Sequence, residues 1–227
     1  MKKMMYREAV AEALREEMAR DEKIFIMGED VAIIGGVYKA TKGLLEEFGP
    51  SRVRNTPISE AAIASVATGA AMAGARPVAE IMHIDFLASC MDSIANQMAK
   101  MHYKTGGSIT VPLVVRTQGG RSHSNSCTQS QMLESWVTHI PGLKVVMPAT
   151  PYDVKGLLKA SIRDNNPVIF IEHKGLYQTK GEVPEEDYII PLGNADIKRE
   201  GTDISIITYS KQVLTSLEAT AELQKAG

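Results

Sequence analysis

Only two cysteines, Cys90 and Cys127, occur among the 227 residues. Two cysteines in a chain of this length form neither a disulfide framework nor a paired zinc site. The longest uncharged stretch, residues 61–75, is rich in Ala and Gly and is shorter than the roughly 20 apolar residues that a membrane span needs. The first residues contain no apolar signal core and no run rich in Arg and Ser, so we expect a cytoplasmic protein without a membrane segment.

An excess of charge of one sign is also lacking. Twenty-five basic residues against 27 acidic ones leave a net charge of −2, and no basic block interrupts the sequence. This excludes the charge pattern typical of nucleic-acid binding. Hydrophobic residues make up 44% and charged residues 23% of the chain, which is the composition of an ordinary globular protein.

Short apolar runs alternate with amphipathic segments, a pattern typical of strand and helix units around a parallel sheet. We therefore predict an α/β fold, with a mostly parallel sheet and helices on both faces. Strands are expected at 23–30, at 51–55, at 76–82, at 111–116, at 143–147 and at 167–173. Helices are expected at 6–20, 41–48, 59–74 and 85–103, before Pro141, and from Pro151.

The segment 175–202 breaks this alternation because it is polar and contains Pro and Gly. Its length and composition indicate a connector between domains. We therefore predict a first domain at 1–174, a linker at 175–202, and the first strand and helix of an incomplete second α/β domain at 203–227.

Ligands of parallel sheets bind beyond the carboxyl ends of the strands, which directs attention to residues 28–30, 56–60, 83–86 and 118–131. Neither the dinucleotide fingerprint G-x-G-x-x-G nor a P-loop occurs, so the sequence does not support a phosphate cradle or a stand-alone nucleotide-binding oxidoreductase. The histidines show no metal-ligand spacing. His123 lies in the last of these segments, residues 118–131, whose side chains are mostly small and polar. It is either a surface residue without a role or a binding residue.

Glu60 precedes the uncharged stretch 61–75, which we expect to form a buried helix capped by Ser59. Two interpretations of Glu60 are open. It is either a carboxylate that complements the positive end of the helix dipole or a buried acid in a ligand crevice.

Several blocks of sequence, in order, carry a specific resemblance. They are MGEDV at 27–31, FGPSRV at 48–53, TPISEAAI at 56–63, RPVAEIM at 76–82, DF at 85–86 and IPGLKVVMPATPYDVKGLLKASIRDNNPVIFIEHK at 140–174. Together they resemble the β subunit of the thiamine-diphosphate-dependent component of 2-oxoacid and acetoin dehydrogenase complexes, whose fold is the transketolase-like pyrimidine-binding domain. The likeness covers nearly the whole chain, and the tail EHKGLYQTKGEVPEEDYIIPLG resembles the acetoin type most.

The resemblance implies roles for three residues. Glu60 matches the family's glutamate that hydrogen-bonds the aminopyrimidine ring of thiamine diphosphate and favours the tautomer that activates the thiazolium carbon. Ile58 and Phe86 match positions that line the aminopyrimidine pocket, with core packing as the alternative for both.

The resemblance also implies partners. The family's α subunit binds the diphosphate and Mg²⁺ through a Gly-Asp-Gly motif, which this chain lacks, so an α2β2 heterotetramer acting with a lipoyl acyltransferase core is expected. Relatives bind potassium near the ASIRDNNP turn. The matching residues here are Leu113, Ser161, Ile162, Asp164 and Asn166, and a solvated turn is the alternative.

The sequence departs from the family at Gln129. Relatives carry a catalytic histidine there, which transfers protons and passes the acyl group to the lipoyl arm, whereas a glutamine amide does not titrate near neutrality. Three explanations stay open: His123 replaces the missing histidine, the substrate differs, or the chain is a weakly active or non-catalytic partner that stabilises or regulates an α subunit.

Overall fold

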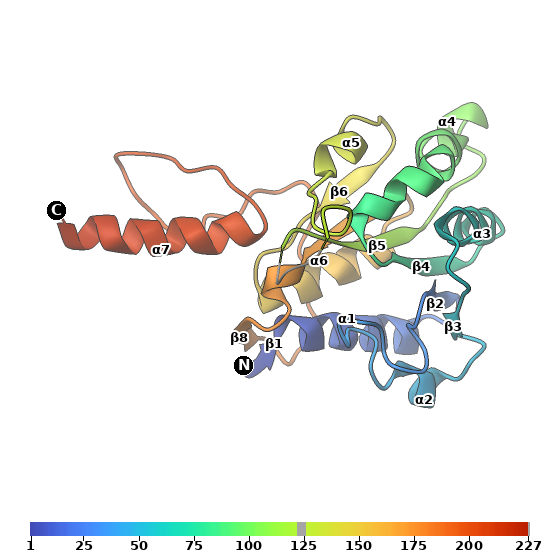
Figure 1. The fold of residues 1–227 in the computed structure, drawn as a ribbon, viewed down its shortest axis with the longest axis horizontal. Helices are drawn as coiled ribbons and strands as arrows, with labels where there is room; N and C mark the ends of the chain where they lie inside the picture. Colours follow the sequence, from blue (N-terminus) through green and yellow to red (C-terminus); the bar gives the residue numbers. More distant parts are fainter. Residues whose placement is uncertain (122–125, 227) are drawn as a thin grey trace.

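The computed structural model describes residues 1–121 and 126–226. Its centre is a six-stranded sheet in the order β3-β2-β4-β5-β7-β6, in which every neighbouring pair is parallel (Figure 1). The strands are β2 (Ile24–Gly28), β3 (Val53–Asn55), β4 (Arg76–Ile81), β5 (Val114–Gly119), β6 (Lys144–Val146) and β7 (Val168–His173). All six carboxyl ends therefore lie at one edge of the sheet.

Helices cover both faces of this sheet. The faces are distinct because side chains alternate along a strand. Val168 and Phe170 of β7 pack in one hydrophobic cluster with helices α1 (Tyr6–Arg20) and α6 (Pro151–Arg163). Ile169 and Ile171 pack in another with helix α3 (Glu60–Met72). The prediction of an α/β fold with helices on both faces is confirmed.

Two expected helices differ in form. The expected helix 85–103 is instead a 3-10 helix η1 (Ile84–Cys90), a π-helical segment η2 (Ser93–Met98) and a short helix α4 (Met101–Lys104). The Ser89 hydroxyl donates to the Phe86 carbonyl at 2.9 Å, a local bond of the kind that competes with regular helix. The expected helix 41–48 forms only as α2 (Leu44–Phe48), and the helix before Pro141 is α5 (Glu134–Thr138).

The expectation that the uncharged helix is buried is only half right. One face of α3 is buried through Ile63, Ala64, Ala67 and Ala71. The opposite face is exposed and carries only small or apolar side chains, Ala61, Ala62, Ser65 and Val66, together with Gly69. Within this chain, α3 thus has one packed and one open face.

The structure differs from the prediction at two places, within the segment predicted as a linker and at the strand expected after it. Residues Lys180–Val183 form strand β8, which pairs antiparallel with β1 (Lys2–Met5) and so belongs to the first domain's structure. Residues 203–208 form no strand, because no neighbouring strand within the described residues offers them a hydrogen-bonding partner. Helix α7 (Lys211–Ala226) follows and projects away from the sheet (Figure 1).

None of the helices in the described part of the chain is both long and apolar enough to cross a lipid bilayer.

Candidate functional site

The candidate site lies at the carboxyl edge of the sheet, where α3 begins. Glu60 is the first residue of α3 and is half-buried. Ser59 precedes it, but its side chain makes no capping hydrogen bond, contrary to the expectation. The helix start instead closes through the Ser59 carbonyl, which accepts the Ile63 amide at 2.9 Å. Within the described part of the chain, the start of α3 therefore has no side-chain cap.

Ser89 connects Glu60 to Phe86. Its hydroxyl oxygen lies 3.5 Å from Glu60 Oε2 and 2.9 Å from the Phe86 carbonyl oxygen. Glu60 and Phe86 are 26 residues apart in sequence, and the turn of η1 places them at one point. Through Ser89 the structure thus brings together the Glu60 carboxylate and the Phe86 backbone, two residues that the resemblance assigns to the aminopyrimidine pocket.

Carboxylates gather around Glu60. Partial burial first, and then the negative charges of Glu60, Asp30 and Glu80, raise the pKa of Glu29 at the end of β2. Burial, with a further contribution from Glu60, raises the pKa of the Cys90 thiol to about 12. The site therefore favours a ligand that donates hydrogen bonds or carries positive charge.

His83 extends the site from Phe86 toward β7. The two rings meet edge to face, with centroids 5.3 Å apart. His83 Nδ1 lies 3.4 Å from Nζ of Lys174, and the same ammonium group donates to the backbone carbonyl of Gln129. Contacts therefore run without a break from Glu60 through Ser89, Phe86, His83 and Lys174 to Gln129. They join the segments of Glu60 and Gln129, predicted as catalytic, and of Phe86, predicted to bind the cofactor.

Burial lowers the pKa values of the two basic groups in this series of contacts, His83 and Lys174. Desolvation, followed by the positive charge of Lys174, lowers the pKa of His83, and Asp85 opposes this shift. Desolvation also lowers the pKa of Lys174. His83 is consequently neutral near pH 7.

A buried network of charged residues lies within the sheet, next to the site. Arg116 of β5 is fully buried and donates to Glu80 Oε2 at 2.7 Å and to the two oxygens of Glu172 at 2.6 and 2.9 Å. The Tyr177 hydroxyl donates to Glu172 at 2.6 Å. Arg116 thus ties together three neighbouring strands just before their carboxyl ends.

Unpartnered polar atoms test whether a polar ligand fits this edge. Among the described residues, Oδ2 of Asp85, Oγ1 of Thr56 and Oγ of Ser130 are buried without a hydrogen-bond partner. All three belong to segments that follow strands or flank Gln129. Buried polar groups are normally satisfied, so these atoms, with the half-buried Glu60 and the aromatic Phe86, fit a ligand with polar ring atoms such as thiamine diphosphate.

The series of contacts among the described residues does not include two other predicted residues, Ile58 and His123. Ile58 is 81% exposed, so this chain alone does not bury it in a pocket. His123 lies outside the described residues. Sequence reasoning missed Lys174 and Ser89, and it included His83 in the ligand-binding segment 83–86 without giving it a role. Lys174 was detectable, because it directly follows a strand at the ligand-binding edge.

The predicted potassium ligands lie around the end of α6 and the start of β7. The carbonyl oxygens of Ile162 and Asp164 already accept hydrogen bonds from Arg76, at 2.9 and 2.6 Å, and the Leu113 carbonyl accepts the Val168 amide at 2.9 Å. Each carbonyl has a second lone pair, so potassium binding stays a prediction.

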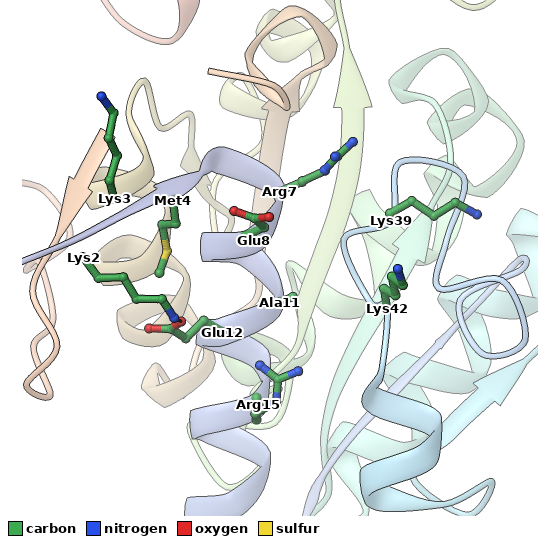
Figure 2. Close-up of a pocket in the computed structure, with 10 residues that line it drawn as sticks. All are labelled: Lys2, Lys3, Met4, Arg7, Glu8, Ala11, Glu12, Arg15, Lys39 and Lys42. Carbon is green, nitrogen blue, oxygen red and sulfur yellow. Dashed lines mark hydrogen bonds and ion pairs between the residues drawn. The ribbon is translucent and has the colours of Figure 1, made fainter. Parts of the chain in front are cut away.

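A hollow of about 440 Å³ lies elsewhere, between the start of α1 and the segment 39–42, and contains none of these residues. Figure 2 shows Arg7 extending toward the segment that carries Lys39 and Lys42, with Lys2 beside Glu12. It is an open basic surface, and we do not assign the site to it.

Comparisons with known proteins identify the family of the chain. The family described as "Transketolase, pyrimidine binding domain" matches residues 2–180, which defines the class of domain. The chain is 48% identical, over its full length and 70% of theirs, to the 2-oxoisovalerate dehydrogenase subunit beta and to the pyruvate dehydrogenase E1 component subunit beta of Bacillus subtilis (strain 168). It is also 48% identical to the acetoin:2,6-dichlorophenolindophenol oxidoreductase subunit beta of the same organism, over 97% of this chain and 68% of that one.

A solved structure titled "Split gene transketolase, inactive beta4 tetramer" superposes with a TM-score of 0.78 over 99% of this chain and 68% of that chain, at 20% identity, which supports the fold alone. The chain belongs to the family of β subunits of thiamine-diphosphate-dependent dehydrogenases for pyruvate, 2-oxoisovalerate or acetoin.

Proposed function

We propose that this chain is the β subunit of a cytoplasmic thiamine-diphosphate-dependent dehydrogenase for acetoin, pyruvate or another 2-oxoacid, and that it is active only with an α subunit in an α2β2 heterotetramer. The observation that carries the proposal is the contact of Glu60 and Phe86 through Ser89 at the carboxyl edge of the sheet. This edge is where parallel sheets bind ligands.

Each residue has a stated task in this proposal. Thiamine diphosphate, when bound, supplies the electron sink for cleaving the bond beside a carbonyl group. The Glu60 carboxylate accepts a hydrogen bond from a ring nitrogen, Phe86 offers its aromatic face, and Ile58 is covered once the α subunit docks. The α subunit holds the diphosphate and Mg²⁺, and a lipoyl acyltransferase core receives the acyl group. Potassium, if bound, stabilises the turn after α6.

Glu60→Gln in the reconstituted αβ enzyme tests the role of Glu60. We expect turnover with an artificial electron acceptor to fall by about 100- to 10,000-fold, the usual effect of losing an acid–base group, while the thermal midpoint stays at the wild-type value. Glu46→Gln, at an exposed position of α2, is the matched control and should leave turnover unchanged. Full turnover of Glu60→Gln would refute the proposal.

A second function, that of a non-catalytic partner subunit, is favoured by Gln129 alone. Calorimetry separates the two functions, because a purely structural subunit leaves thiamine-diphosphate affinity unaffected by Glu60→Gln. For Gln129 we expect weak acyl transfer to a lipoyl domain, and an increase with Gln129→His. If lipoyl-linked turnover is already full and Gln129→His lowers it, the inferred impairment is wrong.

A further inference from the structure

Position 129 cannot supply a proton, because its side chain is an amide. Any acid–base group that serves the substrate in this chain must come from another element. The described residues that adjoin both Phe86 and the segment of Gln129 include one imidazole, His83, which packs against Phe86 and contacts the lysine that holds the Gln129 backbone.

We propose that His83 exchanges a proton with an oxygen atom of the substrate, and that Lys174 is the positioning residue that contacts the His83 ring and supplies it with a replacement proton. This inference rests on the proposed function and deepens it, because it assigns the acid–base group at the same site. The substrate class is a 2-oxoacid or hydroxyketone, whose carbonyl or hydroxyl oxygen takes and returns a proton during carbon–carbon cleavage.

The contact with Lys174 determines the tautomer of His83. An ammonium group has donors only, so Nδ1 of His83, 3.4 Å away, must present its lone pair. The ring proton of the neutral imidazole is then on Nε2. Among the described residues, Nε2 has no hydrogen-bond partner, which leaves its N–H free for a ligand.

The proton balance is closed within the pair. When Nε2–H gives its proton to the substrate oxygen, Lys174 passes a proton to Nδ1, so His83 stays neutral and Lys174 becomes a neutral amine. In the reverse step, Nε2 accepts the proton back and Nδ1–H returns its own to Lys174. No oxidant, reductant or further reactant is needed.

The charges around the pair suit this exchange. Lys174 is 3% exposed, and its burial lowers its pKa, so it gives up a proton more readily than a surface lysine. Asp85 acts on both groups and favours their charged forms. Asp85 is itself held by Gln131, whose side-chain amide donates to Oδ1 at 2.7 Å. These are the charged groups that face His83 from η1 and from the end of β7.

The first test needs neither cofactor nor turnover. Long-range ¹H–¹⁵N NMR of the 227-residue chain reports the tautomer and pKa of each imidazole, and His83→Asn identifies the His83 resonances by their loss. We expect the Nε2–H tautomer at neutral pH and a pKa below the ordinary value. Lys174→Met should raise that pKa because it removes a positive charge, and Lys174→Arg should restore it. The Nδ1–H tautomer, or a pKa that does not respond to Lys174→Met, would overturn the proposal.

The second test measures kcat against pH in the reconstituted αβ enzyme. We expect His83→Asn to lower kcat by about 100- to 10,000-fold and to abolish the fall of kcat at high pH, which reports loss of the proton from Lys174. Affinity for thiamine diphosphate should stay unchanged. His139→Asn, at an exposed histidine beyond α5, is the matched control and should behave as wild type.

The two proposals fail differently. If His83→Asn keeps the wild-type kcat and pH profile while Glu60→Gln is inactive, the relay is wrong and the proposed function stands. If Glu60→Gln is fully active, the proposed function is wrong. In that case the NMR result alone decides whether Lys174 controls the His83 ring.

Discussion

Arg116→Met should be the most destabilising single change in the sheet. Arg116 is fully buried and holds two carboxylates, Glu80 and Glu172, that are 4% and 0% exposed. Methionine fills much of the same volume but leaves both carboxylates without their counterion. Removing one partner of a buried ion pair costs about 3–5 kcal/mol, whereas a whole domain is stable by about 5–15 kcal/mol. We therefore expect the variant to lose between about a fifth and all of its free energy of unfolding.

The loss should depend on pH. Burial raises the pKa of Glu80 even with Arg116 present, and Arg116 opposes this shift. Without Arg116 the folded-state pKa rises further above the unfolded value of about 4.3. A raised carboxyl pKa destabilises the fold increasingly as pH climbs above the unfolded pKa. The destabilisation by Arg116→Met should consequently be smaller at about pH 5.5 than at about pH 7.5.

Urea unfolding followed by circular dichroism at both pH values measures the effect. Arg15→Met is the matched control, because Arg15 pairs with Glu47 at 2.7 Å on the surface, with both side chains about 40% exposed. It should cost about 0–1 kcal/mol. If Arg116→Met costs no more than this control, or equally much at both pH values, the argument from buried charge is refuted.

Three further outcomes are expected. Gly120→Ala should destabilise the chain by more than about 1 kcal/mol in urea unfolding, because φ is +74° and the new Cβ would lie 2.3 Å from His173 Nε2; wild-type stability would contradict this. A thiol reagent at neutral pH should modify exposed Cys127 at once and buried Cys90, whose pKa is raised to about 12, only on unfolding; equal rates would contradict this. Thr150→Ala removes an N-cap hydroxyl that accepts an amide at 3.1 Å at the start of α6, and should cost about 1 kcal/mol by the same assay.

The sequence predicts the sheet well because its strands are buried on both faces and appear as nearly continuous apolar runs. PVIFIEH is the clearest case, and β7 covers all of it except its proline. The segment 203–208 contains three isoleucines and is also predicted as a strand, but no strand forms there. Hydrophobic pattern alone does not make a strand when a partner strand is lacking.

The helix 85–103 shows a different limit of sequence reasoning. The hydrophobic periodicity indicates the buried face, which includes Leu87, Cys90, Ile94 and Met98. It does not indicate side-chain hydrogen bonds that change the backbone conformation. Ser89 bonds to the Phe86 carbonyl, and Ser93 bonds to Ser65 of α3 at 2.6 Å. The second of these joins residues 28 positions apart, so no local pattern reveals it.

The candidate site was only partly predictable, for a topological reason. Glu60 and Phe86 each follow a strand, and their segments were identifiable as ligand-binding loops. The contact of His83 with Lys174 spans 91 residues and requires knowing that β4 and β7 lie on either side of β5. Strand order is not encoded in the strand sequences themselves, so the pair could not be found from the sequence.

The end of β5 explains how the segments after β4 and β7 can meet above it. Gly119 pairs with His173, and Cβ atoms at Gly119 and Gly120 would lie 2.7 Å from Met132 Sδ and 2.3 Å from His173 Nε2. Gly119 thus leaves room for Met132, and the Gly120 amide donates to the Gln131 carbonyl at 3.0 Å. The Lys174 ammonium group donates to the carbonyl of Gln129, two residues before Gln131. A side chain at Gly119 would displace Met132, and so would disturb the contact between the Gln129 carbonyl and the lysine that contacts His83.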